Sequence, residues 1–226
     1  MKKSKFSSFF YEWFIFILIV LAGVLIVYQI FYSKNKGSIY YSNLALINQD
    51  YSKDWSLGNR NAKLVLVYYS DFKCPACAYY HTKFLNNLLK DFKDQILIVF
   101  RHFPLPGHSG SRELAYAAEA AGKQGKFWEM ADLIFNNQQK FLLSKDLNKE
   151  IMNLALFLNI DIEKFKSDLN SEEVKNKVEK DYLDALKMNL PGTPSFFLNG
   201  KQIFISASYD EFKIFLENEI KKINSN

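Results

Sequence analysis

The sequence predicts an α/β fold in which a four-stranded mixed sheet carries helices on its faces and an all-helical block is inserted between its two halves. A strand–helix–strand pattern covers residues 63–100, helical periodicity runs through residues 110–188, and two short strands follow from residue 195. The first pattern is a βαβ unit, whose strands run parallel and side by side. The later strands and the helix after them form a ββα unit that completes the sheet.

Two apolar segments predict the parallel strands. Lys63–Tyr69 and Gln95–Phe100 are short runs rich in β-branched and aromatic residues, as is typical of buried strands. The segment between them has helical spacing. One face of this expected helix carries the apolar residues Cys77, Tyr80, Phe84, Leu85, Leu88 and Leu89.

Residues 110–188 predict the inserted helical subdomain. Apolar residues recur at helical spacing in three stretches, namely Phe127, Ala131, Ile134 and Phe135, then Leu147, Ile151, Leu154 and Leu158, then Val174, Val178, Tyr182 and Ala185. Such stripes are the core faces of packed helices. No residue on them indicates a cofactor, and we expect no cofactor.

The strand period returns after Pro191. Ser195–Leu198 and Gln202–Ile205 flank an Asn-Gly pair at residues 199–200, and Asn-Gly is the strongest short hairpin signal. Ser208 then begins a last helix. The apolar face of this helix contains Phe212, Phe215, Leu216 and Ile220.

The composition is that of a globular protein with a mildly basic surface. Of the 226 residues, 49% are hydrophobic and 23% are charged, which allows a sizeable core. The net charge of +5 comes from dispersed lysines, with no basic block and only three arginines, Arg60, Arg101 and Arg112. We therefore expect no nucleic-acid partner.

The N-terminus predicts a membrane anchor over residues 13–32. Three lysines precede an apolar run from Trp13 to Tyr32, and twenty helical residues rise about 30 Å, the thickness of the bilayer core. A cleaved signal peptide is the alternative, but the run is longer than usual and lacks small residues at a cleavage site. A buried core helix is a further alternative that the all-round apolarity disfavours.

The predicted organisation has four parts. Residues 1–12 are the cytoplasmic N-terminus, 13–32 the anchor, 33–54 a polar linker, and 55–226 the folded domain. Lysines lie on both sides of the anchor, so their distribution indicates its orientation only weakly. The short basic N-terminus favours a cytoplasmic location for this end of the chain. We expect a single-pass protein of the cell (inner) membrane, with its domain periplasmic or extracellular.

Cys74-Pro75-Ala76-Cys77 lies where the first parallel strand ends and the helix begins, and these are the two cysteines of the chain. A helix N-terminus favours the thiolate through its dipole and its free N–H groups. Pro75 suits the first helical turn, where its missing N–H costs nothing. Cys74, nearer the open end, is the predicted attacking thiol, and Cys77, one turn deeper, the resolving thiol.

A zinc site is the alternative for a Cys-x-x-Cys. The remaining nitrogen ligands are His81, His102 and His108, so two cysteines and two histidines are arithmetically available. A packing or surface role is the better interpretation of each histidine, and we expect no metal. His102 and His108, near Arg101, are candidates to modulate the thiolate.

A second motif, Gly192-Thr193-Pro194, precedes the hairpin, and with it the chain resembles the DsbA-like thioredoxin-fold proteins. The resemblance covers about residues 55–222. It is carried by Tyr69-Ser70-Asp71-Phe72-x-Cys74-Pro75-x-Cys77, Arg101-His102-Phe103-Pro104-Leu105, Gly125-Lys126-Phe127-Trp128-Glu129-Met130 and Gly192-Thr193-Pro194-Ser195-Phe196-Phe197-Leu198-Asn199-Gly200, with Gly58-Asn59 and His81.

The resemblance implies a thioredoxin fold with a helical insertion, and a disulfide oxidoreductase with Cys74, Cys77 and Pro194 as catalytic residues. It implies that Pro194 is cis and packs against the disulfide. The backbone of Thr193 would pair with the substrate chain, and Pro75 and Ala76 join Thr193 as candidate substrate-binding residues. The implied partners are exported polypeptides with cysteines and a quinone-linked membrane protein that recharges the disulfide.

Two departures leave the direction of exchange open. Thioredoxin-like proteins often have a buried acid six residues before the first cysteine, where this chain has Tyr68, and the nearest carboxylate is Asp71. The dipeptide Pro-Ala also lacks the histidine of strong oxidases. An oxidase is the leading prediction, and a reductase or isomerase is the near alternative. A thiol-based metal carrier and a non-catalytic anchored domain are the alternatives of other classes.

Overall fold

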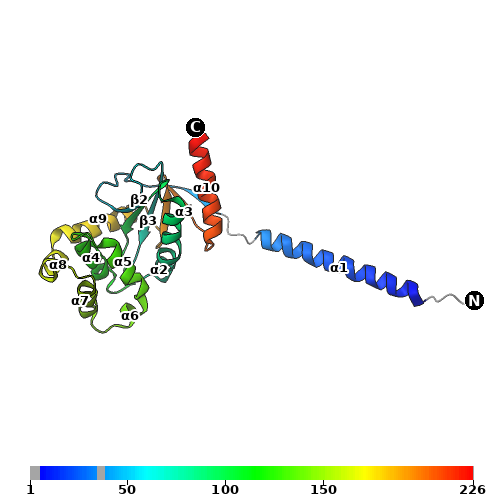
Figure 1. Cartoon of the computed structure of the whole chain (residues 1–226), viewed down its shortest axis with the longest axis horizontal. Coiled ribbons are helices and arrows are strands. Elements are labelled where there is room, and N and C mark those ends of the chain that lie inside the picture. The colour runs from blue at the N-terminus through cyan, green and yellow to red at the C-terminus, as the bar shows by residue number, and fades with distance from the viewer. Residues whose placement is uncertain (1–5, 35–38, 226) are drawn as a thin grey trace, which may run out of the picture. The chain divides into compact units, whose positions relative to one another are not determined.

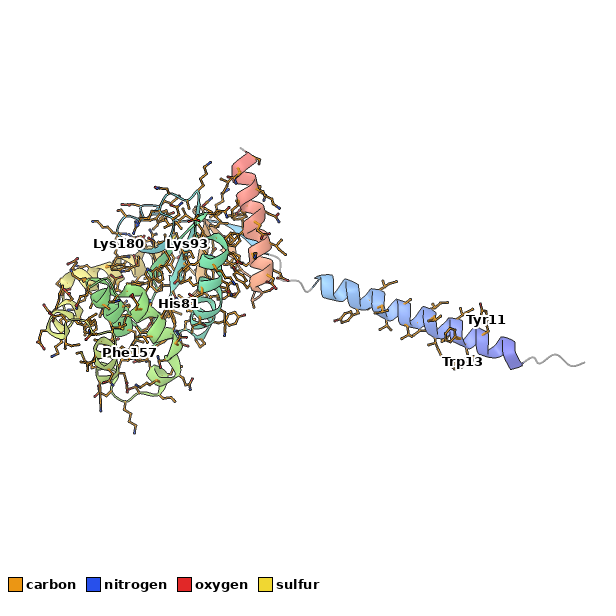
Figure 2. The ribbon with its side chains drawn as sticks, in the orientation of Figure 1. Tyr11, Trp13, His81, Lys93, Phe157 and Lys180 are labelled. Carbon is orange, nitrogen blue, oxygen red and sulfur yellow. The ribbon has the colours of Figure 1, made fainter. Side chains whose placement is uncertain are left out.

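The computed structural model describes residues 6–34 and 39–225, and the chain divides into two units, Met1–Ser38 and Ile39–Asn226. The first unit contains helix α1 (Phe6–Lys34; Figure 1). Figure 2 shows Tyr11 and Trp13 on this helix. Tyr11 is 68% exposed and Trp13 57%.

The helix expected near the N-terminus is therefore present. Among the residues that the structure describes, however, no helix is long and apolar enough to cross a membrane. The transmembrane anchor predicted over residues 13–32 is thus not found in the structure, and the side chains of residues 29–32 lie outside its described part.

The second unit is built on a mixed sheet, in which β2 and β3 are labelled in Figure 1. The strand order of this sheet is β1-β6-β5-β3-β4-β2. Strand β3 (Leu64–Ser70) runs parallel to β4 (Ile96–His102), as the βαβ pattern predicted. Strand β5 (Ser195–Leu198) pairs antiparallel with β3, and β6 (Lys201–Phe204) pairs antiparallel with β5. The thioredoxin-type βαβ–ββα sheet is confirmed.

Two edge strands extend the four that the sequence predicted. Strand β1 (Tyr40–Ala45) pairs antiparallel with β6, and β2 (Trp55–Gly58) pairs antiparallel with β4. Residues 40–45 fall within the predicted linker 33–54 and instead belong to the sheet. Strands of four and six residues are too short to give a clear two-residue alternation, and their pairing partners lie far away in the sequence.

The helix that follows the cysteines has three segments. Helix α2 (Pro75–Tyr80) continues through a π-helical segment, η1 (His81–Leu85), into α3 (Asn86–Phe92). Four residues of the predicted apolar face, Cys77, Phe84, Leu85 and Leu88, are buried in the core together with Phe92, and the other two, Tyr80 and Leu89, are partly buried against it.

The helical insertion is also confirmed. It consists of α4 (Ser111–Gly122), α5 (Phe127–Asn136), α6 (Gln138–Leu143), α7 (Leu147–Phe157), α8 (Ile162–Leu169) and α9 (Glu172–Lys187), and α10 (Tyr209–Ser225) closes the chain. The larger buried cluster joins this insertion to the sheet face that carries Tyr68 and Phe100. The opposite face packs Val67 and Tyr69 against Ala185 of α9.

Candidate active site

The two cysteines lie at the junction of β3 and α2, as expected. Cys74 is the N-cap residue of α2 and Pro75 occupies its first turn. The Cys74 carbonyl accepts a hydrogen bond from the Ala78 N–H at 3.1 Å, so the first helical turn holds the backbone of the attacking residue. Both cysteines are free thiols in the structure.

Cys74 has the environment of a reactive thiol. Its Sγ donates a hydrogen bond to the carbonyl oxygen of Thr193 at 3.3 Å. Hydrogen bonding from Cys77 lowers the pKa of Cys74 to about 6, against the opposing effect of burial, and the side chain of Thr193 and the backbone N–H groups of Cys77 and Ala76 lower it further. The thiolate therefore predominates at neutral pH.

Cys77 has the opposite environment. Both residues are buried, Cys74 with 6% and Cys77 with 1% of its surface exposed, but burial raises the pKa of Cys77 well above the ordinary value, and Cys74 raises it further. The backbone N–H of Asp71 points to its Sγ at 3.5 Å. A low pKa suits an attacking thiol and a high pKa a resolving thiol, and the assignment of these roles to Cys74 and Cys77 stays a prediction.

The segment before β5 completes the site. The Thr193–Pro194 peptide bond is cis, as the resemblance implied. The contact between Cys74 and Thr193 joins residues 119 positions apart in the chain. A groove of about 350 Å³ runs from Pro191 past Pro194 to Ile205, and Pro75 and Ala76 are exposed. The candidate substrate-binding residues thus lie at an open surface beside Cys74.

Asp71 is a site residue whose role the sequence did not reveal. Its carboxylate is fully buried and accepts hydrogen bonds from the Lys73 N–H at 2.7 Å and the Leu105 N–H at 2.8 Å. It also accepts from His108 Nδ1 at 2.7 Å and from the Ser111 hydroxyl. Four donors from three segments thus fix the loop that leads into Cys74.

Gln138 was also missed. From α6, its side-chain amide donates to the carbonyls of Phe72 and Cys74 at 2.9 and 3.0 Å. These bonds hold the insertion against the cysteine loop. No local sequence pattern predicts these hydrogen bonds, because an isolated glutamine on a helix is typical of a surface residue.

The three histidines do not gather around the cysteines. Each contacts a different carboxylate at 2.7 Å, namely His81 with Asp132, His102 with Glu119 and His108 with Asp71. Within the described part of the chain, no three His, Cys, Asp or Glu side chains are grouped so that they could hold a metal ion. The geometry of the described residues therefore does not support a zinc site made of two cysteines and two histidines.

Comparison with known proteins shows the family of the chain. A family model described as thioredoxin matches residues 50–218, which include both cysteines and Pro194. The chain is 35% identical over 179 residues to the "Probable disulfide bond formation protein D" of Bacillus cereus, a match that covers 76% of this chain and 81% of the relative. The protein of the same name from Bacillus anthracis is 31% identical over 211 residues, covering 91% and 92%.

Two solved structures are similar in fold to this chain. Oxidised BdbD from Bacillus subtilis has a TM-score of 0.66 and 29% identity, covering 79% of this chain and 100% of that chain. The crystal structure of α-DsbA1 from Wolbachia pipientis shares the fold at 24% identity and a TM-score of 0.61, covering 75% of this chain and 90% of that chain.

Proposed function

Since the chain belongs to the thioredoxin family, as a DsbA-like thiol–disulfide oxidoreductase, we propose that it is an oxidase that passes a Cys74–Cys77 disulfide to exported polypeptides. The Bacillus relatives are named for disulfide bond formation, which supports this direction. A reductase or isomerase would use the same two cysteines, starting from the dithiol form.

The low pKa of Cys74 is the observation that carries the proposal. A pKa of about 6 means that the thiolate is stabilised in the dithiol form. Stabilising the dithiol makes the disulfide easier to reduce, so the disulfide form tends to give its oxidising equivalents to a substrate. A substrate thiolate attacks Cys74 Sγ, the Cys74–Cys77 bond breaks, and Cys77 leaves with the electron pair.

The redox equilibrium of Cys74 and Cys77 with glutathione tests the direction. Oxidases of this fold have potentials near about −120 mV and reductases near about −270 mV. We expect a value closer to the oxidase end. A potential at or below that of the reductases would contradict the oxidase assignment and favour reduction.

Trapping tests the substrates. Cys77→Ser leaves Cys74 able to attack, with nothing to resolve the product, so mixed disulfides with exported proteins should accumulate. Cys74→Ser is the matched control and should trap none, because Cys77 is almost fully buried and its raised pKa keeps it a thiol. Equal trapping by the two variants would reverse the assignment of the attacking thiol.

We further propose that residues 13–32 anchor the chain in the cell membrane with residues 40–226 outside the cytoplasm, and that a quinone-linked membrane protein recharges the disulfide. The apolar run of the sequence supports the anchor. Carbonate extraction should leave the chain in the membrane, and protease should reach residues 40–226 only from the outer side. A soluble product that begins near residue 33 would mean that the segment is a cleaved signal peptide.

The recharging partner has its own measurement. Depletion of quinone should leave the chain as the dithiol in vivo, which alkylation of its free cysteines would reveal. A disulfide that persists without quinone would point to another oxidant.

A further inference from the structure

The thiol of Cys77 has no direct route to water for its proton. Cys77 must gain a proton when it leaves the disulfide and lose one before it attacks a mixed disulfide. The residue is 1% exposed and its pKa is raised by burial, so a neighbouring group has to hold that proton.

Two unpartnered polar atoms lie beside this thiol. Ser70 Oγ and His102 Nδ1 are among the four buried side-chain polar atoms without a hydrogen-bond partner in the described residues. Ser70 and His102 are partners in the parallel pairing of β3 with β4 and are each 1% exposed. Their side chains therefore stand next to one another on one face of the sheet.

Ser70 connects this pair to the sulfur. Ser70 lies beside the sulfur because the backbone N–H of the next residue, Asp71, points to Cys77 Sγ at 3.5 Å, and its hydroxyl lowers the pKa of Cys77 against the larger effect of burial. His102 lies on the same side as the cysteine loop, since its ring centroid is 6.0 Å from that of Phe72. Because a serine hydroxyl rotates about its C–O bond, Ser70 can turn its hydrogen towards Cys77 or towards His102.

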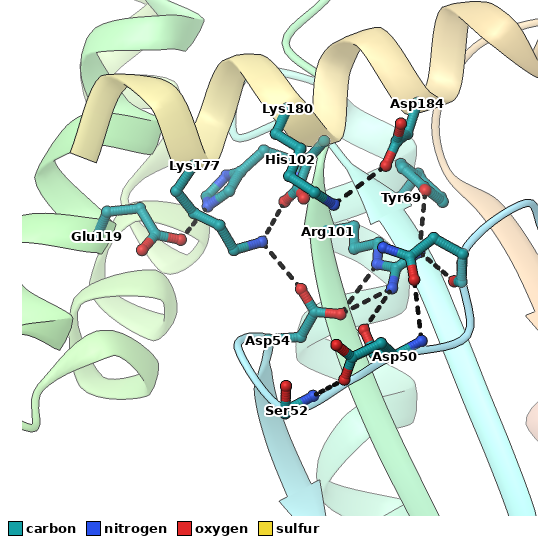
Figure 3. A network of polar contacts seen from close by, with 12 residues as sticks. Asp50, Ser52, Asp54, Tyr69, Arg101, His102, Glu119, Lys177, Lys180 and Asp184 are labelled. Atoms are coloured by element: carbon teal, nitrogen blue, oxygen red, sulfur yellow. Dashed lines mark hydrogen bonds and ion pairs between the residues drawn. The ribbon is translucent and has the colours of Figure 1, made fainter. Parts of the chain in front are cut away.

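Glu119 determines which nitrogen of His102 is available. Its carboxylate contacts His102 Nε2 at 2.7 Å, and the contact is drawn as a dashed line in Figure 3. Burial raises the pKa of Glu119, but His102 and Lys177 together lower it by more, so the group is a carboxylate at neutral pH. A carboxylate only accepts hydrogen bonds, so Nε2 carries a hydrogen, and the unpartnered Nδ1 is the ring nitrogen that faces the relay.

We propose that Ser70, His102 and Glu119 form a proton relay for Cys77. This inference rests on the proposed function, the dithiol exchange at Cys74 and Cys77. As Cys77 prepares to attack, its proton passes through Ser70 to His102 Nδ1, and Glu119 stabilises the resulting imidazolium. The thiolate of Cys77 then forms the bond to Cys74 and expels the substrate thiolate. In the opposite direction the proton returns to Cys77 as the Cys74–Cys77 bond breaks. His102 acts through Ser70 and is a positioning residue.

Other ionisable groups surround the relay. Around His102 and Glu119 these are Asp181 and Lys177 of α9, and around Cys77 they are Cys74, Asp71 and Tyr68. A competing route starts at Tyr68, whose hydroxyl lies 3.3 Å from His81 Nδ1, and His81 contacts the largely exposed Asp132. This second chain supplies a matched control variant, Asp132→Asn.

A two-phase reaction separates the two thiols. One equivalent of dithiobis(nitrobenzoate) releases a first coloured thiolate when Cys74 attacks and a second when Cys77 resolves the mixed disulfide. Stopped-flow absorbance across a pH series would be compared for wild type, Glu119→Gln, Ser70→Ala, His102→Gln and Asp132→Asn. Circular dichroism verifies folding, and the small changes Glu119→Gln and Ser70→Ala carry the test if His102→Gln does not fold.

We expect the second phase of Glu119→Gln and Ser70→Ala to be about 100-fold slower than wild type at neutral pH, the lower end of what a positioned acid–base group contributes. The difference should close at high pH, where Cys77 ionises without help, and the first phase and Asp132→Asn should match wild type. Second phases that superimpose on wild type, or slowing in Asp132→Asn instead, would overturn the relay. A wild-type protein without any second phase would refute dithiol exchange itself.

Discussion

Asp71 and Asp54 are both buried carboxylates with several hydrogen-bond donors, yet their surroundings differ. Asp71 collects two backbone N–H groups, a serine and a histidine beside the cysteines. Asp54 instead faces full positive charges. Arg101 donates to it through Nε and Nη2 at 3.0 and 2.8 Å, and Lys177 donates at 2.9 Å.

The region around Asp54 joins parts of the fold that lie far apart in sequence (Figure 3). Asp54 precedes β2, Arg101 belongs to β4, and Lys177 belongs to α9, where it also bonds to Asp181 at 2.6 Å. Burial lowers the pKa values of Arg101 and Lys177, but Tyr69 and Asp54 at the arginine, and Asp181 and Asp54 at the lysine, raise them by more. Both cations therefore stay charged.

The different donors around Asp54 and Asp71 indicate different roles for the two carboxylates. Removing Asp54 leaves the buried charges of its cationic partners uncompensated, which lowers the free energy of unfolding. These charges do not contact the thiols. Removing Asp71 leaves mostly neutral donors without a partner and loosens the loop that carries Cys74. Asp54 should therefore govern stability, and Asp71 the reactivity of the site.

The largest expected effect is on Asp54. Asp54→Ala should destabilise the fold by about 3–5 kcal/mol, the usual cost of removing one partner of a buried ion pair. Denaturant unfolding of the purified full chain measures this, while the pH at which Cys74 alkylation is half-maximal should not move. Glu163→Ala, which removes an exposed pair with Lys166, is the control and should change stability by less than about 0.5 kcal/mol. A shifted alkylation profile in Asp54→Ala would contradict the proposal that Asp54 acts on stability and not on the reactivity of Cys74.

The pH dependence of stability should come from the thiol region. The pKa of Cys74 is about 6 in the folded dithiol and 9.0 ordinarily, so the unfolded chain binds the extra proton between these values. Stability should therefore be lowest below pH 6 and rise between pH 6 and 9, by up to about 1.4 kcal/mol per pH unit. The raised pKa of Cys77 opposes this only above about pH 9.

Unfolding of the reduced chain across this pH range tests the assignment. Cys74→Ser should flatten the curve, whereas Asp54→Ala should lower it without changing its slope. A slope that survives Cys74→Ser would assign the titration to another group.

A smaller loss of stability is expected at Asp71, with a clear effect on the thiols. Asp71→Asn keeps the shape but turns an NH₂ group towards donors, which should cost about 1–3 kcal/mol. We expect Cys74 alkylation to shift from near pH 6 towards its ordinary pKa of 9.0, because the loop that aligns the Cys74 contacts loosens. An unchanged alkylation profile would show that Asp71 is only a structural residue.

The smallest effect should follow loss of one donor to Asp71. Ser111→Ala removes the hydroxyl that Asp71 accepts, and three other donors remain. We expect a loss of about 1 kcal/mol by denaturant unfolding and a shift of Cys74 alkylation in the same direction as in Asp71→Asn. A larger loss than that of Asp71→Asn would contradict the central position of the carboxylate.

The sequence by itself determined the elements whose signals are local. The apolar runs of β3 and β4 and the helical stripes of residues 110–188 were readable because burial leaves a period in the chain. The hairpin was readable because Asn199 and Gly200 take positive φ angles of 47° and 80°, which few other residues tolerate. The Cys74-Pro75-Ala76-Cys77 motif revealed its own chemistry because its parts are adjacent.

The tertiary structure alone decided the contacts around that motif. Asp71 receives donors 34 to 40 positions away, Gln138 reaches Cys74 across 64 positions, and Thr193 meets Cys74 across 119. The edge strands β1 and β2 likewise depend on partners elsewhere in the chain. A hydrogen bond leaves no period in the sequence, because its energy depends on where two distant segments are packed and not on their neighbours in the chain.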